Sequence, residues 1–270
     1  MHFKSICILS FLVVFGLACN RSEERANGEN KNILTGAFNK SQLGGCDTTT
    51  NKGISIKIDL WEPADSGKVG SAIRDVLTAK SIQRINSYGD SASIAANPGA
   101  SQSVKGAFQV FEKNYNDFKK DFPDAPGCWE VQLKGDTVYS TPDVLFYQLD
   151  HYSFAGGAHP NTFRSYHAFD LKTGQELQMK SFVADSVALL NLVEAYFRKT
   201  EKISKDVNLE EEGYFLLNNQ FAIPVSYVFT PKGVLFYYNP YEIAPYARGA
   251  IQFTIPYAEL KGIMDRERVM

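Results

Sequence analysis

One stretch, Leu145–Leu177, constrains the fold more than any other part of the chain. Apolar and polar residues alternate along both of its arms, and turn-forming residues fill its middle, Ala155–Asn161. This pattern predicts a long antiparallel hairpin with one face in a core. If the chain reverses near His159, His151 lies opposite His167 on the apolar face. The other face is predicted to be solvated and carries Gln148, Asp150, Arg164 and Asp170.

The segments before this hairpin predict both strands and helices. Strict alternation over Ile54–Leu60 indicates a strand, and helical spacing predicts a helix over residues 68–86. Residues 91–103 are rich in Ser, Ala and Gly and predict a loop. Apolar and aromatic residues then recur at intervals of three and four over Val104–Phe122, which predicts a helix stopped by Pro123.

The remaining elements are short and mostly extended. Two short strands, Trp129–Leu133 and Thr137–Tyr139, are predicted on either side of a turn at Gly135. Ser181 or Asp185 is expected to cap a helix that carries Val187, Leu190, Val193 and Phe197 on one side. The last part predicts strands at 225–229, 234–238 and 251–255, and a short helix at Tyr257–Met264. Strands joined mainly by hairpins, with the helices segregated, predict an α+β fold.

Several strings in the sequence resemble one family of bacterial envelope domains. These strings are YSFAGGAHPNTF, FDLKTGQEL, TPKGVLFYYNPYEIAPYARG and IPYAEL, in this order along the chain. They resemble the paired extracytoplasmic domains of RsiV-type lysozyme-sensing anti-sigma factors, a pair that also precedes the catalytic domain of PdaC-type peptidoglycan deacetylases. The resemblance implies two packed domains of mainly antiparallel sheet with helices on one side, a PdaC-like domain over 51–165 and an RsiV-like domain over 166–270.

The N-terminus has the pattern of a secretory signal. Residues 1–18 place Lys4 before an apolar run, and small Ala18 stands just before Cys19. This placement is similar to a lipoprotein processing site, so we expect a lipid on Cys19 and a protein held at the bacterial cell envelope by that anchor alone. Residues 19–50 are then a tether and lead-in. An ordinary secreted protein, with Cys19 incidental, is the alternative.

Two cysteines remain after this segment, Cys46 and Cys128. In an oxidising envelope compartment they can form a disulfide. Two buried free thiols are the other possibility. A structural zinc site is not indicated, because no histidine lies near either cysteine in the sequence.

Charge and motifs exclude several classes of function. The formal net charge is −2, and no basic run suggests a nucleic-acid partner. No phosphate-binding loop, serine-hydrolase elbow or zinc-protease motif occurs, so no cofactor is predicted. His151, His159 and His167 do not predict a metal site, because eight residues of extended chain separate His159 from the other two by about 26 Å.

Two segments have the composition of a binding surface. One is the hairpin turn, where His159 and Asn161 offer polar groups. The other is Asn239–Gly249, which contains Tyr241, Glu242, Tyr246 and Arg248 together with two prolines. Tyrosine and arginine are enriched in binding hot spots. The alternative is that these prolines and tyrosines only stiffen a long connection.

These observations lead to two hypotheses of function. The first is a non-enzymatic, lipid-anchored envelope protein that binds a partner through these two segments; the resemblance implies lysozyme or peptidoglycan. The chain shows neither a membrane-spanning helix nor a deacetylase domain after the pair, so the family's signalling and catalytic activities do not follow. The second is a glycan hydrolase or deacetylase-type enzyme that uses His159 and a nearby carboxylate as acid and base.

Overall fold

The structure is a computed structural model that describes residues 34–47, 49–50, 52–125, 127–265 and 267. The predicted signal (1–18), Cys19 and residues 20–33 and 48 of the predicted tether and lead-in lie outside these residues. A six-stranded sheet comprises β1 (Gly36–Asp47), β2 (Lys52–Pro63), β3 (Trp129–Ser140), β4 (Val144–Phe154), β5 (Asn161–Asp170) and β6 (Glu176–Leu177). A three-stranded sheet comprises β7 (Ser226–Thr230), β8 (Gly233–Tyr238) and β9 (Ile251–Ile255).

The helices connect strands and do not alternate regularly with them. Between β2 and β3 lie α1 (Lys68–Asn86), α2 (Ser91–Ala96), the 3-10 helix η1 (Pro98–Ser101) and α3 (Val104–Asp121). Before β7 lie η2 (Met179–Phe182) and α4 (Ser186–Glu201), and η3 (Tyr246–Arg248) precedes β9. Only β2 and β3 pair in parallel; the other neighbouring strands are antiparallel. The predicted α+β fold is confirmed.

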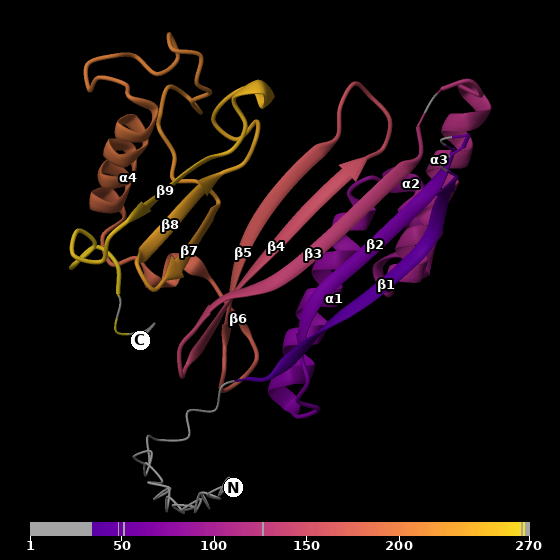
Figure 1. Ribbon diagram of the computed structural model, residues 1–270, viewed down its shortest axis with the longest axis horizontal. Coiled ribbons are helices and arrows are strands. Elements are labelled where there is room, and N and C mark those ends of the chain that lie inside the picture. Colours follow the sequence, from indigo (N-terminus) through magenta and orange to yellow (C-terminus); the bar gives the residue numbers. More distant parts are fainter. Residues whose placement is uncertain (1–33, 48, 51, 126, 266, 268–270) are drawn as a thin grey trace, which may run out of the picture. The chain divides into compact units, whose positions relative to one another are not determined.

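The strands of the six-stranded sheet lie side by side in the same order as they occur in the sequence, from β1 to β6. Because β2 and β3 are parallel, the chain must cross over between them, and this crossover contains the helices. Figure 1 shows α1, α2 and α3 gathered on one face of the sheet. Among the described residues, no helix covers the other face of β1 to β4 (Figure 1), which leaves its side chains for other contacts.

The central hairpin forms, but its register differs from the predicted one. His151 lies opposite Phe163, and His167 lies opposite Tyr147. The prediction placed the reversal near His159, whereas the chain reverses around Gly156 and Gly157, whose positive φ angles suit a turn. The predicted register differs from the observed one by an even number of residues. The side chains that were predicted to share the apolar face therefore still lie on one face of the hairpin.

One face of the hairpin packs on the helices. Leu145, Tyr147 and Leu149 of β4 and Phe169 of β5 share a core with α1 and α3. The amphipathic stripes of those helices supply its other side; the buried members include Ile73, Leu77, Ile85, Phe111 and Tyr115. Phe122, the last residue of the predicted stripe, is exposed because the helix ends at Asp121.

The opposite face of the hairpin was predicted to be solvated throughout, which is wrong for one end of it. Val144 and Phe146 of β4 and Ala168 of β5 are buried in a second core with the three-stranded sheet and α4. Phe146 stacks on Phe229 of β7, with ring centroids 5.4 Å apart. The hairpin is therefore buried from both sides near its base, and Asp150 and Arg164 stay half-buried on the other part of this face.

Several predicted boundaries are wrong for local reasons. Residues 36–47, expected in the lead-in, form the edge strand β1, whose mostly polar and exposed sequence gives no alternation. The expected loop at 91–103 contains α2 and η1, capped by Asp90 and Asn97. The expected turn at Gly135 lies inside the continuous strand β3, where Tyr147 packs directly over the glycine. Tyr257–Met264 forms turns and not a helix.

The predicted domain boundary between residues 165 and 166 falls within β5, whose sheet continues to Leu177. The division of the chain at that point stays a prediction.

Asp185 caps the N-terminus of α4, which was one of the two predicted alternatives. Val187 does not join the buried face of α4, because Leu189, Val193 and Phe197 form that face and Val187 is 67% exposed.

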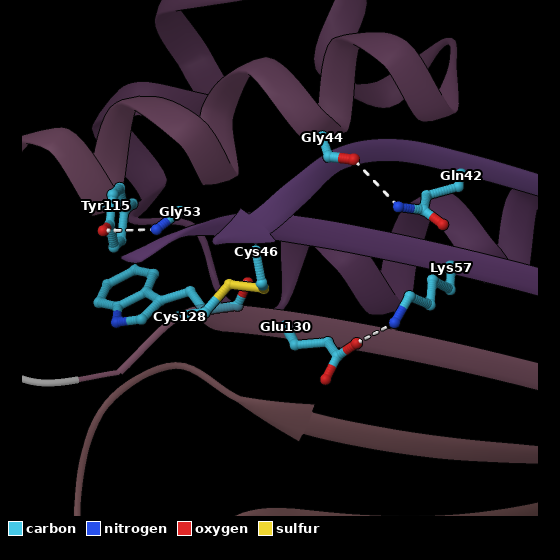
Figure 2. Close-up of a disulfide and its surroundings, with 9 residues drawn as sticks. Gln42, Gly44, Cys46, Gly53, Lys57, Tyr115, Cys128 and Glu130 are labelled. Atoms are coloured by element: carbon cyan, nitrogen blue, oxygen red, sulfur yellow. Dashed lines mark hydrogen bonds and ion pairs between the residues drawn. A yellow bond between two sulfur atoms is a disulfide. The ribbon is translucent and has the colours of Figure 1, made fainter. Parts of the chain in front are cut away.

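A disulfide joins Cys46 at the end of β1 to Cys128 just before β3. Figure 2 shows it beside two further links, the hydroxyl of Tyr115 accepting from the backbone of Gly53 and Lys57 paired with Glu130. The two cysteine Cα atoms are 5.7 Å apart. The bond therefore fixes the exposed edge strand β1 to the rest of the sheet.

We expect the double variant Cys46→Ala/Cys128→Ala to lose about 4 kcal/mol of unfolding free energy, because the bond closes a long loop in the unfolded chain. The loop spans 82 residues in sequence. Chemical denaturation of the variant and of the oxidised protein measures the difference. Equal unfolding midpoints for the two would contradict this prediction.

Candidate functional site

The two predicted binding segments, far apart in the sequence, meet in the structure. Nε2 of His159 lies 3.1 Å from the Tyr241 hydroxyl. The His159 ring also stacks on Tyr246, with centroids 4.1 Å apart and planes 15° apart. Nδ1 carries a proton, because it lies 3.0 Å from the Pro160 carbonyl, which can only accept. The three rings form one group, which we call the aromatic cluster: His159, Tyr241 and Tyr246.

The loop that carries the two tyrosines is held by Glu242. One carboxylate oxygen accepts from the backbone nitrogen of Val225 at 2.7 Å, and the other accepts from that of Asn239 at 2.8 Å. Glu242, a predicted binding residue, thus has a positioning role. Tyr241, directly before it, has a φ of 69°. A left-handed conformation is costly for a tyrosine, and such strain is concentrated at functional sites.

A side chain that the sequence analysis did not single out connects this loop to the hairpin. Asn239 is 3% exposed. Its oxygen accepts from the backbone nitrogen of Arg164 at 2.6 Å, and its nitrogen donates to the Arg164 carbonyl at 3.0 Å. It thus bonds both backbone groups of one residue of β5, whose carbonyl also accepts from the Ser226 hydroxyl at 2.7 Å. The signal available in the sequence was only an asparagine before a proline, which usually marks a turn.

We expect Asn239→Ala to destabilise the protein by about 2 kcal/mol, because the backbone nitrogen of Arg164 loses its acceptor and the Arg164 carbonyl loses one of its two donors, the other being the Ser226 hydroxyl. Thermal or chemical unfolding measures this cost. Asn116→Ala, at an exposed asparagine of α3, is the matched control and should cost less than about 0.5 kcal/mol. A cost for Asn239→Ala as small as that of the control would argue against the connection.

The contacts of the other predicted site residues, Arg248 and Asn161, are with residues outside the aromatic cluster. Nε of Arg248 pairs with Glu201 at 3.1 Å, and its guanidinium lies 4.4 Å from the ring centre of Tyr214. Arg248 therefore fastens the loop to the connection after α4. Asn161 is exposed at the first position of β5 and pairs in the sheet with Ser153.

Exposed apolar side chains gather around the same loop. Phe215, Leu217 and Val225 are 48%, 77% and 73% exposed, and Tyr241 is 50% exposed. The backbone nitrogen of Phe215 donates to the Ile243 carbonyl at 2.8 Å, so this segment is bonded directly to the loop. Clustered exposed apolar groups on a soluble domain mark interaction surfaces. The sequence analysis did not select these residues because their exposure depends on the tertiary fold.

A second polar network lies on the helix side of the hairpin. The Ser165 hydroxyl lies 2.9 Å from Nε2 of His167, whose Nδ1 lies 2.7 Å from Glu176. Lys80 of α1 pairs with the other oxygen of Glu176 at 2.9 Å. Burial lowers the pKa of His167, so the neutral ring donates from Nδ1 and accepts from Ser165. Burial acts to raise the pKa of Glu176, but hydrogen bonds from His167 and Lys80 prevail and lower it to about 2.

This order of serine, histidine and carboxylate is the one that activates serine nucleophiles. The same carboxylate is engaged by Lys80, and the network connects α1, β5 and β6. None of the three residues lines any of the four cavities found among the described residues. The geometry supports a packing role for this network.

His151 is a buried core histidine, as its place on the apolar face predicts. It is 5% exposed, and its Nε2 lies 2.8 Å from the Tyr88 hydroxyl. Tyr88 donates its single proton to Ser153 at 2.6 Å, so Nε2–H must donate to Tyr88. Nδ1 has no hydrogen-bond partner among the described residues. Burial, and secondly the charge of Arg84, lower the pKa of His151 to about 3.

The low pKa of His151 makes stability depend on pH. Below about pH 6.5 the unfolded chain binds a proton at this residue, whereas the folded protein does so only near pH 3. Stability is therefore lost as pH falls from 6.5 toward 3, by at most about 1.4 kcal/mol per pH unit from this group. We expect His151→Phe, which keeps a ring there, to lose less stability between pH 7 and pH 5 than the wild type. Urea denaturation at both pH values measures this; parallel losses would overturn it.

The described residues contain no group of three or more His, Cys, Asp or Glu side chains arranged to hold a metal ion. Within the same part of the chain, no helix has the length and apolar character needed to span a membrane. One cavity there, about 1070 Å³, is mainly apolar and lies beside Phe229, Tyr257 and Leu260. It contains none of the predicted site residues.

Comparisons with known proteins agree with the resemblance seen in the sequence. A family model described as "Deacetylase PdaC" matches residues 50–162, and one described as "Protein of unknown function (DUF3298)" matches residues 182–258. No curated protein matches the chain. The two matches, in this order, correspond to the PdaC-like and RsiV-like domain pair that the sequence predicts, and the predicted resemblance is confirmed.

Two crystal structures of DUF3298 family proteins share the fold. The protein from Pseudomonas aeruginosa PAO1 is 17% identical, with a TM-score of 0.63 over 88% of this chain and 97% of its own. The one from Bacteroides fragilis NCTC 9343 is 19% identical, with a TM-score of 0.63 over 86% of this chain and 96% of its own. At these identities the likeness establishes the fold alone.

Proposed function

We propose that this chain is a non-enzymatic binding protein of the bacterial cell envelope that captures a protein partner through the aromatic cluster and the apolar side chains around it. The single observation that carries this proposal is the meeting of His159, Tyr241 and Tyr246 on one exposed surface. Stacked tyrosines present large contact areas at a low cost in side-chain entropy. A lipid on Cys19 would hold the protein at the membrane surface.

Three features of the surface favour a protein over a small molecule. The cluster lies beside exposed Phe215 and Val225, which extend it as an apolar patch. Its loop is held from both ends, by Asn239 on β5 and by Arg248 on Glu201, so little order has to be gained on binding. None of the four cavities opens on His159, Tyr241 or Tyr246.

A c-type lysozyme is the partner that the family resemblance suggests. The charges near the loop suit this basic protein, because Glu210, Glu211 and Glu212 are all exposed in the connection that Arg248 contacts. Complementary charge speeds association and sets orientation more than it raises affinity. Binding should therefore weaken as salt concentration rises.

The alternative, a hydrolase or deacetylase-type enzyme, requires a carboxylate within reach of His159. In the described part of the chain, the hydrogen bonds of the His159 ring go to Tyr241 and Pro160. Glu242, the nearest acid in the loop sequence, has both oxygens engaged with backbone nitrogens. The geometry thus supports binding better than acid–base catalysis.

Titration of the purified protein with a c-type lysozyme, followed by calorimetry at two salt concentrations, tests the proposal. We expect saturable binding that Tyr241→Asn weakens by about tenfold or more, because a central aromatic residue is lost. Asparagine tolerates the left-handed backbone of this position, so the loop keeps its course.

Phe122→Ala is the matched control, because Phe122 is also an exposed aromatic residue, 58% exposed, but lies at the end of α3. Its affinity should equal that of the wild type. No heat with lysozyme would remove this partner and make peptidoglycan fragments the next ligand to test. Equal weakening by both variants would reject the aromatic cluster as the binding surface.

A further inference from the structure

The helix-free face of the six-stranded sheet carries a row of charges of alternating sign. Cross-strand register places Lys40, Asp59, Lys134, Asp150 and Arg164 side by side on β1, β2, β3, β4 and β5. With strands about 4.8 Å apart, the row is about 19 Å long. Like charges are nowhere adjacent, which suits a stable face.

At each end of the row, two neighbouring residues form an ion pair with each other. Lys40 pairs with Asp59 at 2.9 Å. Arg164 holds Asp150 in a two-pronged contact of 2.6 and 3.1 Å. Lys134 lies between these two occupied carboxylates and has no ion-pair partner among the residues that the structure describes. It is exposed, so its ammonium group is open to an anion from outside.

Two hollows open along this row and share Lys134. One, about 420 Å³, is lined by Gln132, Asp150, Tyr152, Arg164 and Tyr237 among others. The other, about 430 Å³, continues toward β1 and is lined by Lys40, Gln42, Lys57 and Asp59. Gln132 and Lys134 line both hollows. The two hollows lie next to each other along the row of charges, and we call them together the sheet groove.

The chemistry of the sheet groove combines hydrogen-bonding groups with ring faces. Gln132 offers both donors and an acceptor, Asp150 accepts, and Lys134 donates. Tyr152 and Tyr237 are half-buried at one end, where the Arg164 guanidinium lies 4.9 Å from the ring centre of Tyr237. Sugar hydroxyl groups donate and accept at once, and the C–H face of a sugar ring packs on an aromatic ring.

We propose that the sheet groove binds an acidic oligosaccharide, with a carboxylate of the sugar chain on Lys134 and a ring face against Tyr152 and Tyr237. The groove is lined by four cations and two anions, and Glu130 holds one of the cations, Lys57, so the excess positive charge is that of Lys134, which favours an anionic ligand. An extended peptide is less suited, because every strand here is already hydrogen-bonded on both sides except at the edges of the sheet. This site is separate from the aromatic cluster and does not depend on the proposed protein partner.

Calorimetric titration of the protein with a tetramer of galacturonic acid tests the proposal. Maltotetraose, which is neutral, and tetraglutamate, which carries the charge without the sugar rings, are the comparison ligands. We expect saturable binding of the acidic sugar alone, weakened about tenfold by Lys134→Gln, because a charge-assisted contact is lost. Binding should also weaken as salt increases.

Lys105→Gln is the matched control, because Lys105 is an exposed lysine on α3 and the helices lie on the other face of the sheet (Figure 1). Its affinity for the acidic tetramer should be that of the wild type, and Tyr241→Asn should also leave it unchanged. Absence of binding, an unchanged affinity in Lys134→Gln, or equally tight binding of maltotetraose or tetraglutamate would each overturn the proposal. A protein that fails to bind lysozyme but still binds the acidic tetramer would leave the proposed sugar site intact.

Discussion

The fold depends on the burial of one hairpin, β4 and β5, from both sides. Its odd-numbered positions pack on α1 and α3, and part of its even-numbered face packs on the three-stranded sheet and α4. Phe146 and Tyr147 are adjacent in sequence, are both fully buried and belong to different cores. Because successive side chains of a strand point to opposite faces, one strand can serve two cores at once.

This double burial also determines where the surface features lie. The even face is covered by the second sheet near the base of the hairpin, and farther along it is left open, with Asp150 and Arg164 at the border. Asn239 joins the second sheet to β5 at the same residue, Arg164, through its backbone. The link positions the loop of Tyr241 and Tyr246 against the hairpin turn. The aromatic cluster and the sheet groove are thus both consequences of how the second sheet packs on β5.

Buried polar groups in this protein are mostly held by specific partners. His151 shares a hydrogen-bonded chain with Tyr88 and Ser153, and His167 shares one with Ser165 and Glu176. Both histidines stay neutral because burial penalises their charged forms, with the pKa lowered in each case. They restrict the packing of the hairpin on α1 and make the fold sensitive to acid.

The sequence by itself determined the alternation of the hairpin arms, the extent of α1 and α3, the α+β class and the two segments that meet in the aromatic cluster. These follow from local periodicity and from turn residues, which act over a few positions. It did not reveal β1, because an exposed edge strand such as Gly36–Asp47 has no buried face to impose a pattern.

Only the tertiary structure decided the register of the hairpin, the Asn239 link, the contact of His159 with Tyr241 and Tyr246, and the lack of an ion-pair partner for Lys134 among the described residues. Each of these depends on which distant segments lie side by side, and a periodic pattern is satisfied equally well by any even shift of register.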